Sequence, residues 1–390
     1  MQTRRRFLLS GVAGVGAPAI PPCAEPGAKE RTIFEPKMIS AGNNRPSVNL
    51  RADRLIEICV ALHRRRMMAS IEQESGGSPD EFRRKLDSLI QAELVKKSSG
   101  RQYLPTFLVV TLEDGKWMAP VARVVEETGR LVAENIPRIR AQAELIPGIR
   151  RTGFTRAAFL ILSNVLLDNW QIRNVEDQFL KAERPLRNGS RYYLALFEKP
   201  AQQRSEAFGI YGNALGTIEG IHLGVYGKQR YDGSTLTSIP EEQYRRLFGV
   251  PPQADLQAEA LELFNRVAAL ARTGADHLSP RQRSGLCKLG LLENGELRVT
   301  VLNSEEADSL GEVAALFTPS LLAVLERHRA QLESTYERSP YKEEVSFNEF
   351  FMWWYHFFYT ATTDWLAQQR LLEIPASGNT TYLITSHRPG

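Results

Sequence analysis

Apolar residues recur every three or four positions in two well-separated stretches of the chain, 54–66 and 256–272. This spacing places the apolar side chains on one face, so it predicts an amphipathic helix in each stretch. The spaced apolar positions are Leu55, Ile58, Cys59 and Leu62 in the first stretch and Leu261, Phe264, Val267 and Leu270 in the second.

A second helix is predicted after each of these stretches. The pairs Ser78-Pro79 and Ser279-Pro280 give the start signal, because Ser caps a helix and Pro fits its first position. Each predicted helix is followed by a polar turn and a β-rich run, at 103–111 and at 296–302.

The same order continues in both halves of the chain. A long helix follows and ends in similar pentapeptides, Arg138–Gln142 and Arg327–Gln331. A further helix begins near Phe154 and near Phe347, and each half closes on β-rich pieces around a glycine turn, at 187–190 and 377–379. Recurrence of elements at a fixed separation indicates an internal duplication.

Two helices followed by a two-stranded wing form the order of elements in a winged helix. Each half therefore resembles a pair of winged-helix-like units, a resemblance to an architecture that does not fix a function. The predicted fold is mainly α with short β-hairpins, an α+β protein built as a tandem pseudo-repeat. The predicted organisation is a signal peptide at 1–19, a tether at 20–50, a first half at 51–200, a Gly-rich inter-half segment at 201–250 and a second half at 251–390.

The chain begins with a predicted export signal. Residues 3–9 read Thr-Arg-Arg-Arg-Phe-Leu-Leu, small residues continue to Ala19, and no acidic residue precedes Glu25. A basic start followed by a weakly apolar stretch is typical of a signal peptide. The order Thr-Arg-Arg-x-Phe-Leu is similar to the twin-arginine signal. The sequence therefore predicts a periplasmic or extracellular protein.

Two alternatives are open for the processing of the N-terminus. Ala17-Pro18-Ala19 offers a small-x-small cleavage site. Cys23 offers the alternative of a lipid anchor, although Ile20-Pro21-Pro22 departs from the small residues that lipidation favours. No transmembrane helix is predicted in the mature chain.

Charge argues against a nucleic-acid partner. Three of the 49 basic residues lie in the predicted leader, which leaves the mature chain near +1 against 45 acidic residues. Nucleic-acid-binding proteins usually show a clustered basic excess. The best candidate for a recognition helix, within 80–97, has balanced charge, and the run His63–Arg66 is interpreted as a solvated helix end.

The three cysteines, Cys23, Cys59 and Cys287, have no metal-like spacing. Cys59 and Cys287 lie among apolar helical residues, which favours buried free thiols. The predicted compartment would also permit a disulfide between them.

The inter-half segment contains glycine at every fourth residue, at 212, 216, 220 and 224. On a helix these glycines would form a smooth stripe, but each costs roughly 1 kcal/mol in a helix interior. A Gly-rich loop or hairpin is therefore an equal alternative. A long loop between two halves favours function. The predicted ligand-binding residues are Tyr211, Asn213, Tyr226 and Asp232.

Three residues are candidates for acid/base chemistry: Glu219, His222 and His356. Glu219 and His222 would touch on a helix, and Glu-x-x-His is half of a di-iron motif. Because no second copy is present, no metal is expected; these two residues are the ligands if one binds.

Residues 347–359 carry apolar side chains on every face, which predicts a helix buried all round. His356, Tyr359 and Asp364 would form a polar trio if they faced a pocket. A core histidine bonded to the backbone is the alternative that we favour.

The sequence shows no nucleophile elbow, phosphate loop, dinucleotide fingerprint, zinc motif or calcium loop. Whether the protein is an enzyme therefore stays open, and no cofactor is named. The leading hypothesis is an exported, non-catalytic scaffold that binds a small molecule or a protein between its halves. The alternatives are an exported enzyme with its site in residues 205–235, and a winged-helix DNA-binding regulator.

Overall fold

The computed structural model describes residues 31–98 and 102–386. Helices make up 52% of the chain and strands 17%, with the strands in several small sheets. The predicted α+β class is therefore confirmed. The predicted signal peptide and Cys23 lie outside the described residues. The predicted tether at 20–50 is wrong for Thr32–Ser40, which form strand β1 of a sheet.

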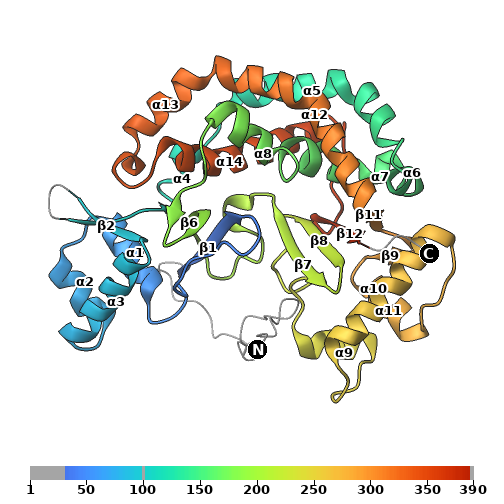
Figure 1. The fold of residues 1–390 in the computed structure, drawn as a ribbon, viewed down its shortest axis with the longest axis horizontal. Helices are drawn as coiled ribbons and strands as arrows, with labels where there is room; N and C mark the ends of the chain where they lie inside the picture. Colours follow the sequence, from blue (N-terminus) through green and yellow to red (C-terminus); the bar gives the residue numbers. More distant parts are fainter. Residues whose placement is uncertain (1–30, 99–101, 387–390) are drawn as a thin grey trace, which may run out of the picture.

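Two four-stranded sheets lie beneath a layer of long helices (Figure 1). In the first sheet, the central strand β6 pairs antiparallel with β1 and parallel with β4, and β5 pairs with the start of β6. In the second sheet, β12 pairs parallel with β11 and antiparallel with β8, and β7 forms the edge. The strands are β1 (Thr32–Ser40), β4 (Leu108–Val110), β5 (Leu186–Arg187), β6 (Ser190–Pro200), β7 (Asn213–Ile218), β8 (Ile221–Gly227), β11 (Val299–Asn303) and β12 (Asn379–Thr385).

Strands β7 and β8 form a hairpin, which decides between the two alternatives for the glycine-rich segment. Its turn residues Glu219 and Gly220 have φ values of 40° and 83°, as a tight two-residue hairpin turn requires. A helix over residues 212–224 is therefore wrong. Because β8 pairs with β12, this segment supplies half of the second sheet and is not a free linker.

The helical layer builds most of the largest core. Its long members pack against one another, and residues of both halves share a single apolar cluster. The buried aromatic helix predicted from residue 347 is α14, which is buried on nearly all sides. The helices of this layer are α4 (Gly115–Met118), α5 (Ala122–Ala143), α6 (Pro147–Thr152), α7 (Phe154–Phe159), η1 (Leu160–Val165), α8 (Ile172–Asn174), η2 (Val175–Leu180), α12 (Ser304–Arg327), α13 (Arg329–Arg338), η4 (Pro340–Glu343) and α14 (Phe347–Gln368). The short η3 (Ala207–Gly209) precedes β7.

Two small helical lobes lie at opposite ends of the molecule, at lower left and lower right in Figure 1. Each contains three helices, a two-stranded hairpin and its own apolar core. The first lobe contains α1 (Leu55–His63), α2 (Met68–Ser75), α3 (Pro79–Gln91), β2 (Val95–Lys97) and β3 (Tyr103–Pro105). The second lobe contains α9 (Glu241–Phe248), α10 (Leu256–Thr273), α11 (Pro280–Lys288), β9 (Leu292–Glu293) and β10 (Glu296–Leu297).

The predicted Ser-Pro helix starts are confirmed in both lobes. The Ser78 hydroxyl accepts a hydrogen bond from the backbone of Glu81, and the Ser279 hydroxyl accepts one from Gln282. In the second case Gln282 also accepts from the Ser279 backbone, which completes a capping box. The two pentapeptides differ in place: Arg138–Gln142 lies inside the end of α5, whereas Arg327–Gln331 spans the break at His328 between α12 and α13.

Both described cysteines are free. Cys59 is fully buried in the first lobe, as predicted. Cys287 is exposed on α11 of the second lobe, so the prediction that it is buried is wrong.

By length and apolar composition alone, α12 is the one helix among the described residues that would suit a membrane span. Its buried residues, which include Leu310, Phe317 and Leu321, belong to the largest core. A core helix of a folded protein satisfies the same criterion.

Candidate functional site

The three candidates for acid/base chemistry lie apart. Glu219 is exposed in the hairpin turn, and His222 is exposed on β8, where its ring bonds to the Thr217 hydroxyl at 2.9 Å. His356 is buried in α14. Since Glu219 and His222 occupy a hairpin, they do not form the helical Glu-x-x-His pair considered for a metal. Among residues 31–98 and 102–386, no group of His, Cys, Asp and Glu could hold a metal ion.

His356 is a core histidine. Its Nδ1–H donates to the Met352 carbonyl at 2.8 Å, and burial lowers its pKa to about 4, so the ring is neutral. Tyr359 does not bond to it but donates to the Tyr211 carbonyl, and Asp364 pairs with Lys228. The polar trio considered for a pocket is therefore not connected by hydrogen bonds.

Three of the four predicted ligand-binding residues come together. The rings of Tyr211 and Tyr226 stack with centroids 5.9 Å apart, and both are at most 1% exposed. Asn213 begins the same hairpin. A ligand would reach the two tyrosines only if the core opened, so their role as ligand-binding residues remains a prediction.

Asn213 belongs to a buried polar network that joins the hairpin to η1 and β12. Asn213 and Asn164 exchange two amide hydrogen bonds, at 2.9 and 3.0 Å. Tyr382 donates to the Asn213 side chain at 2.9 Å, and Asn213 donates to Asp168 at 3.3 Å. Burial raises the pKa of Asp168 to about 7. The sequence carried a signal for this network, since Asn164 and Asp168 interrupt a long apolar run.

Asp232, the fourth predicted ligand-binding residue, stabilises a local turn. Its carboxylate accepts hydrogen bonds from the backbone and the hydroxyl of Ser234. Both contacts lie within two residues, so this arrangement needs no ligand.

A pocket of about 230 Å³ lies between residues of the predicted first half, 51–200, and residues of the predicted second half, 251–390; we call it the inter-half pocket. One wall comes from α6 and α7 of the first half, and the other comes from α10, the β9–β10 hairpin and β11 of the second half. The lining residues are Gly148, Arg151, Thr152, Arg156, Leu270, Ala271, Gly295, Glu296, Leu297, Val299 and Val301.

The two walls differ in chemistry. The first half contributes the guanidinium groups of Arg151 and Arg156, and the second half contributes mainly aliphatic side chains. Gly148 permits the walls to approach, because a Cβ there would lie 2.5 Å from the Val301 carbonyl oxygen. No local pattern in the sequence indicates this pocket, since arginines on the short helices α6 and α7 resemble ordinary solvated charges.

Ion pairs cross between the halves at this pocket. Arg156 pairs with Glu296 at 2.9 Å, and Arg151 lies 3.4 Å from Glu306. Glu306 already accepts hydrogen bonds from the backbone of Gly148 at 3.1 Å and of Asn303 at 2.8 Å. Arg151 therefore adds only a long third contact to a carboxylate that other donors hold.

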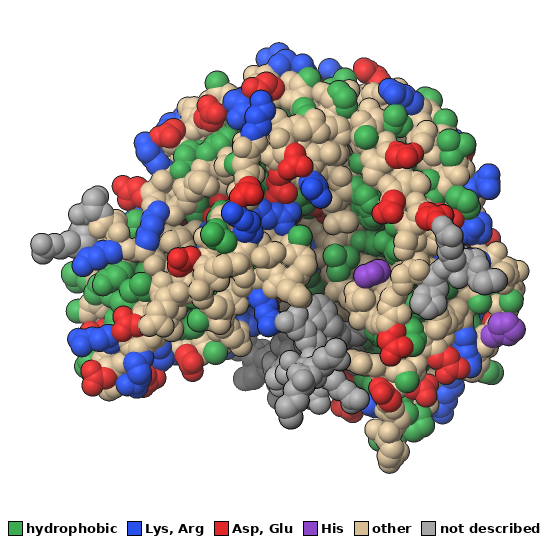
Figure 2. Space-filling model, viewed as in Figure 1, with side chains coloured by type: hydrophobic (Ala, Val, Ile, Leu, Met, Phe, Trp, Pro, Cys, Tyr) green, Lys and Arg blue, Asp and Glu red, His purple; other side chains and the backbone are tan. Residues whose placement is uncertain are grey.

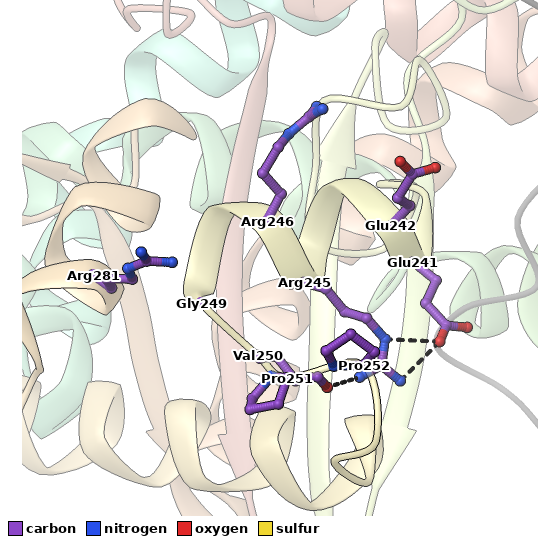
Figure 3. A pocket seen from close by; sticks show the side chains of 9 residues that line it. All are labelled: Glu241, Glu242, Arg245, Arg246, Gly249, Val250, Pro251, Pro252 and Arg281. Carbon is purple, nitrogen blue, oxygen red and sulfur yellow. Dashed lines mark hydrogen bonds and ion pairs between the residues drawn. The ribbon is translucent and has the colours of Figure 1, made fainter.

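A larger hollow of about 710 Å³ is an open groove within the second lobe (Figure 3). Arg245 is fixed there by Glu241 at 2.9 Å and by the Pro251 carbonyl at 2.7 Å. The guanidinium groups of Arg246 and Arg281 form no ion pair with any described residue. Since all its walls belong to one lobe and it is open to solvent, this groove is a weaker candidate for a shaped small-molecule site.

A buried ionic cluster joins the first lobe to the helical layer. His63 lies between two carboxylates, with Nδ1 2.9 Å from Glu344 and Nε2 3.3 Å from Asp114. Burial alone would lower the pKa of His63, but its hydrogen bonds to Asp114 and Glu344 outweigh that effect and raise it to about 9. The interpretation of residues 63–66 as a solvated helix end is therefore wrong for His63.

Comparisons with known proteins give no relative: no family model, no curated protein and no solved structure matches this chain.

Proposed function

We propose that this chain is a non-catalytic binding protein, exported through the signal predicted at residues 1–19, whose ligand occupies the inter-half pocket. The observation that carries the proposal is the pocket itself. Both halves line it, and it combines an arginine wall with an aliphatic wall. Ligand sites commonly occupy such junctions and combine an apolar lining with a few convergent polar groups.

The proposal includes two halves that share one plan of winged-helix-like units. Strand pairing supports it: β6 has an antiparallel partner that precedes the first lobe and a parallel partner that follows it. Strand β12 likewise has an antiparallel partner, β8, that precedes the second lobe, and a parallel partner, β11, that follows it. Each lobe ends in two helices and a hairpin, the order of a winged helix.

The placement of the polar candidates favours binding over catalysis. Glu219 and His222 are exposed on a hairpin, whereas His356 is neutral in the core. General acid/base catalysis needs groups within hydrogen-bond reach of one substrate. These three residues lack that arrangement.

The proposal is tested by filling the pocket. Ala271 lines it from α10, and Ala269 on the same helix is also half-buried but does not line it. We expect fragments found by screening against the wild type to raise the Tm of Ala269→Phe as well, but not that of Ala271→Phe. Fragments that stabilise both variants equally, or a screen with no binder, would contradict the proposal.

A second candidate, binding of nucleic acid by the second lobe, is favoured by one observation. Helix α11 contains three basic residues and no acidic one, and exposes Arg281 and Lys288. It also occupies the place of a recognition helix before the wing. Elsewhere on the face in Figure 2, basic and acidic side chains are interspersed and do not form a single patch.

Salt-dependent binding to a mixed-sequence DNA duplex tests this second candidate. If α11 contacts phosphates, Arg281→Gln and Lys288→Gln should each reduce the slope of log K against log salt by about one. Arg173→Gln is the matched control, since Arg173 is exposed on α8. No binding at low salt would exclude this candidate.

A further inference from the structure

Around the inter-half pocket, positive charge exceeds negative charge. Arg151 and Arg156 line it, and Arg272 lies near enough for Arg151 and Glu306 to act on its pKa, which burial lowers. Among the described residues that line the pocket, two guanidinium groups face one carboxylate, that of Glu296, so the lining carries one net positive charge. A ligand that brings one negative charge would neutralise the pocket.

The two lining arginines differ in how firmly their present partners hold them. The Arg156–Glu296 pair is exposed, with side chains 41% and 60% accessible, and exposed pairs contribute little to stability. Arg151 meets a carboxylate that two backbone N–H groups already occupy. Both guanidinium groups therefore have donors that a ligand can engage at little cost.

The opposite wall selects the rest of the ligand. Leu270 and Leu297 present half-buried aliphatic side chains, whereas Val299 and Val301 are already buried in the core of the second lobe. This surface gains free energy when it is covered by an apolar group and offers no side-chain donor or acceptor. The pocket is therefore amphipathic, with a cationic wall facing an apolar one.

We infer that the inter-half pocket binds a small carboxylate with an apolar body, and that the ligand carboxylate displaces Glu296 from Arg156. The apolar body lies against Leu270 and Leu297, and the carboxylate lies between Arg156 and Arg151. This inference rests on the proposed binding function and names the class of its ligand.

Three probes of nearly the same shape separate the charge requirement from simple burial. Benzoate, benzamide and benzamidine share one ring and carry a negative, a neutral and a positive head group. We expect benzoate to bind the wild-type protein about tenfold or more tightly than benzamide, since charge-assisted hydrogen bonds contribute more than neutral ones. Benzamidine should not bind. Titration calorimetry gives each Kd.

Arginine variants assign the preference to this pocket. In Arg151→Gln and in Arg156→Gln, the Kd of benzoate should approach that of benzamide, whereas Arg173→Gln should keep the full preference. Glu296→Gln removes the competitor for Arg156, so it should tighten benzoate binding and leave benzamide binding unchanged.

The outcomes distinguish failure of the carboxylate inference from failure of the proposed binding function. If benzamide or benzamidine binds as tightly as benzoate, and Ala271→Phe abolishes that binding, the pocket is a ligand site but the carboxylate inference is wrong. If benzoate binds Arg151→Gln and Arg156→Gln as tightly as it binds the wild-type protein, the inference is also wrong. If none of the three probes binds, both the inference and the proposed function are overturned.

Discussion

A buried ion pair fixes the start of α14 against the first sheet. Glu349 is 1% exposed and pairs with Arg187, which is 4% exposed, and the second oxygen of Glu349 accepts from the Leu194 backbone at 3.1 Å. Burial raises the pKa of Glu349 to about 7 despite the arginine. Such a pair adds little net stability, but removal of one partner leaves an uncompensated buried charge.

Glu349→Ala should therefore lower the free energy of unfolding by about 3–5 kcal/mol. The double variant Arg187→Met/Glu349→Leu should recover most of that loss, because it removes both charges and keeps the volume filled. Urea denaturation measures all three proteins. A double variant no more stable than Glu349→Ala would show that packing, not charge, holds this junction.

Because the pKa of His63 is raised, we expect the stability of the fold to fall at alkaline pH. Its pKa is about 9 in the fold against 6.5 for a free side chain. Stability from its protonated form is thus fully present below pH 6.5 and is lost as pH rises toward 9. The difference is on the order of 3 kcal/mol. Asp114, Glu344, Arg65 and Lys96 are the charged groups near it.

The free energy of unfolding of the wild type and of His63→Gln should be compared across this pH range. The wild type should lose more stability than the variant between pH 6.5 and 9. Parallel curves would mean that other groups, not His63, control the alkaline behaviour.

At the residue scale, the sequence indicated polar groups of the glycine-rich segment but not the polar groups within apolar runs. Asn213 is one of the predicted ligand-binding residues of the glycine-rich segment, whereas its partners Asn164, in η1, and Asp168, just after that helix, lie 45 to 49 residues earlier. The partners of His63 are Asp114, 51 residues away, and Glu344, 281 residues away. Such distances in the chain leave no local pattern.

Among the elements, the β7–β8 hairpin depends on a close contact that only glycine allows. Gly224 pairs with Tyr382 across the sheet, and a Cβ at residue 224 would overlap the Tyr382 ring. Gly311, in the middle of α12, has no other atom within 4 Å of a Cβ position. Replacement of glycine by alanine should therefore have opposite effects on stability at these two positions.

Gly224→Ala should destabilise the protein, because either the strand or the Tyr382 ring must move. Gly311→Ala should stabilise it by roughly 0.5–1 kcal/mol, since alanine favours a helix interior. Thermal unfolding of both variants checks the pair. A Tm for Gly224→Ala equal to the wild-type value would contradict the close contact seen here.

Element prediction succeeded where the cause is local. Neighbouring residues alone determine three predicted features: the helix caps at Ser78 and Ser279 and the burial of α14 on nearly all sides. All three are present. The β7–β8 hairpin was ambiguous because glycine every fourth residue suits a helix stripe as well as a strand. Its pairing with β12, 152 to 164 residues later, decides the outcome.

For the whole molecule, the two halves are joined by a common core and by charges that cross between them. Residues of both halves share the largest apolar cluster, and Arg156–Glu296 links residues 140 positions apart. An order of elements read from the sequence suggested two halves and a site between them. It did not identify Arg151 and Arg156, because the opposing wall is formed by distant strands.

We propose that a ligand binds in the inter-half pocket. Intermolecular NOEs from benzoate to the protein's methyl groups would locate that ligand. We expect NOEs from the benzoate ring protons to methyl groups of Leu270 and Leu297. NOEs to Val250 in the open groove of the second lobe, or no NOE to any methyl group of the inter-half pocket, would contradict it.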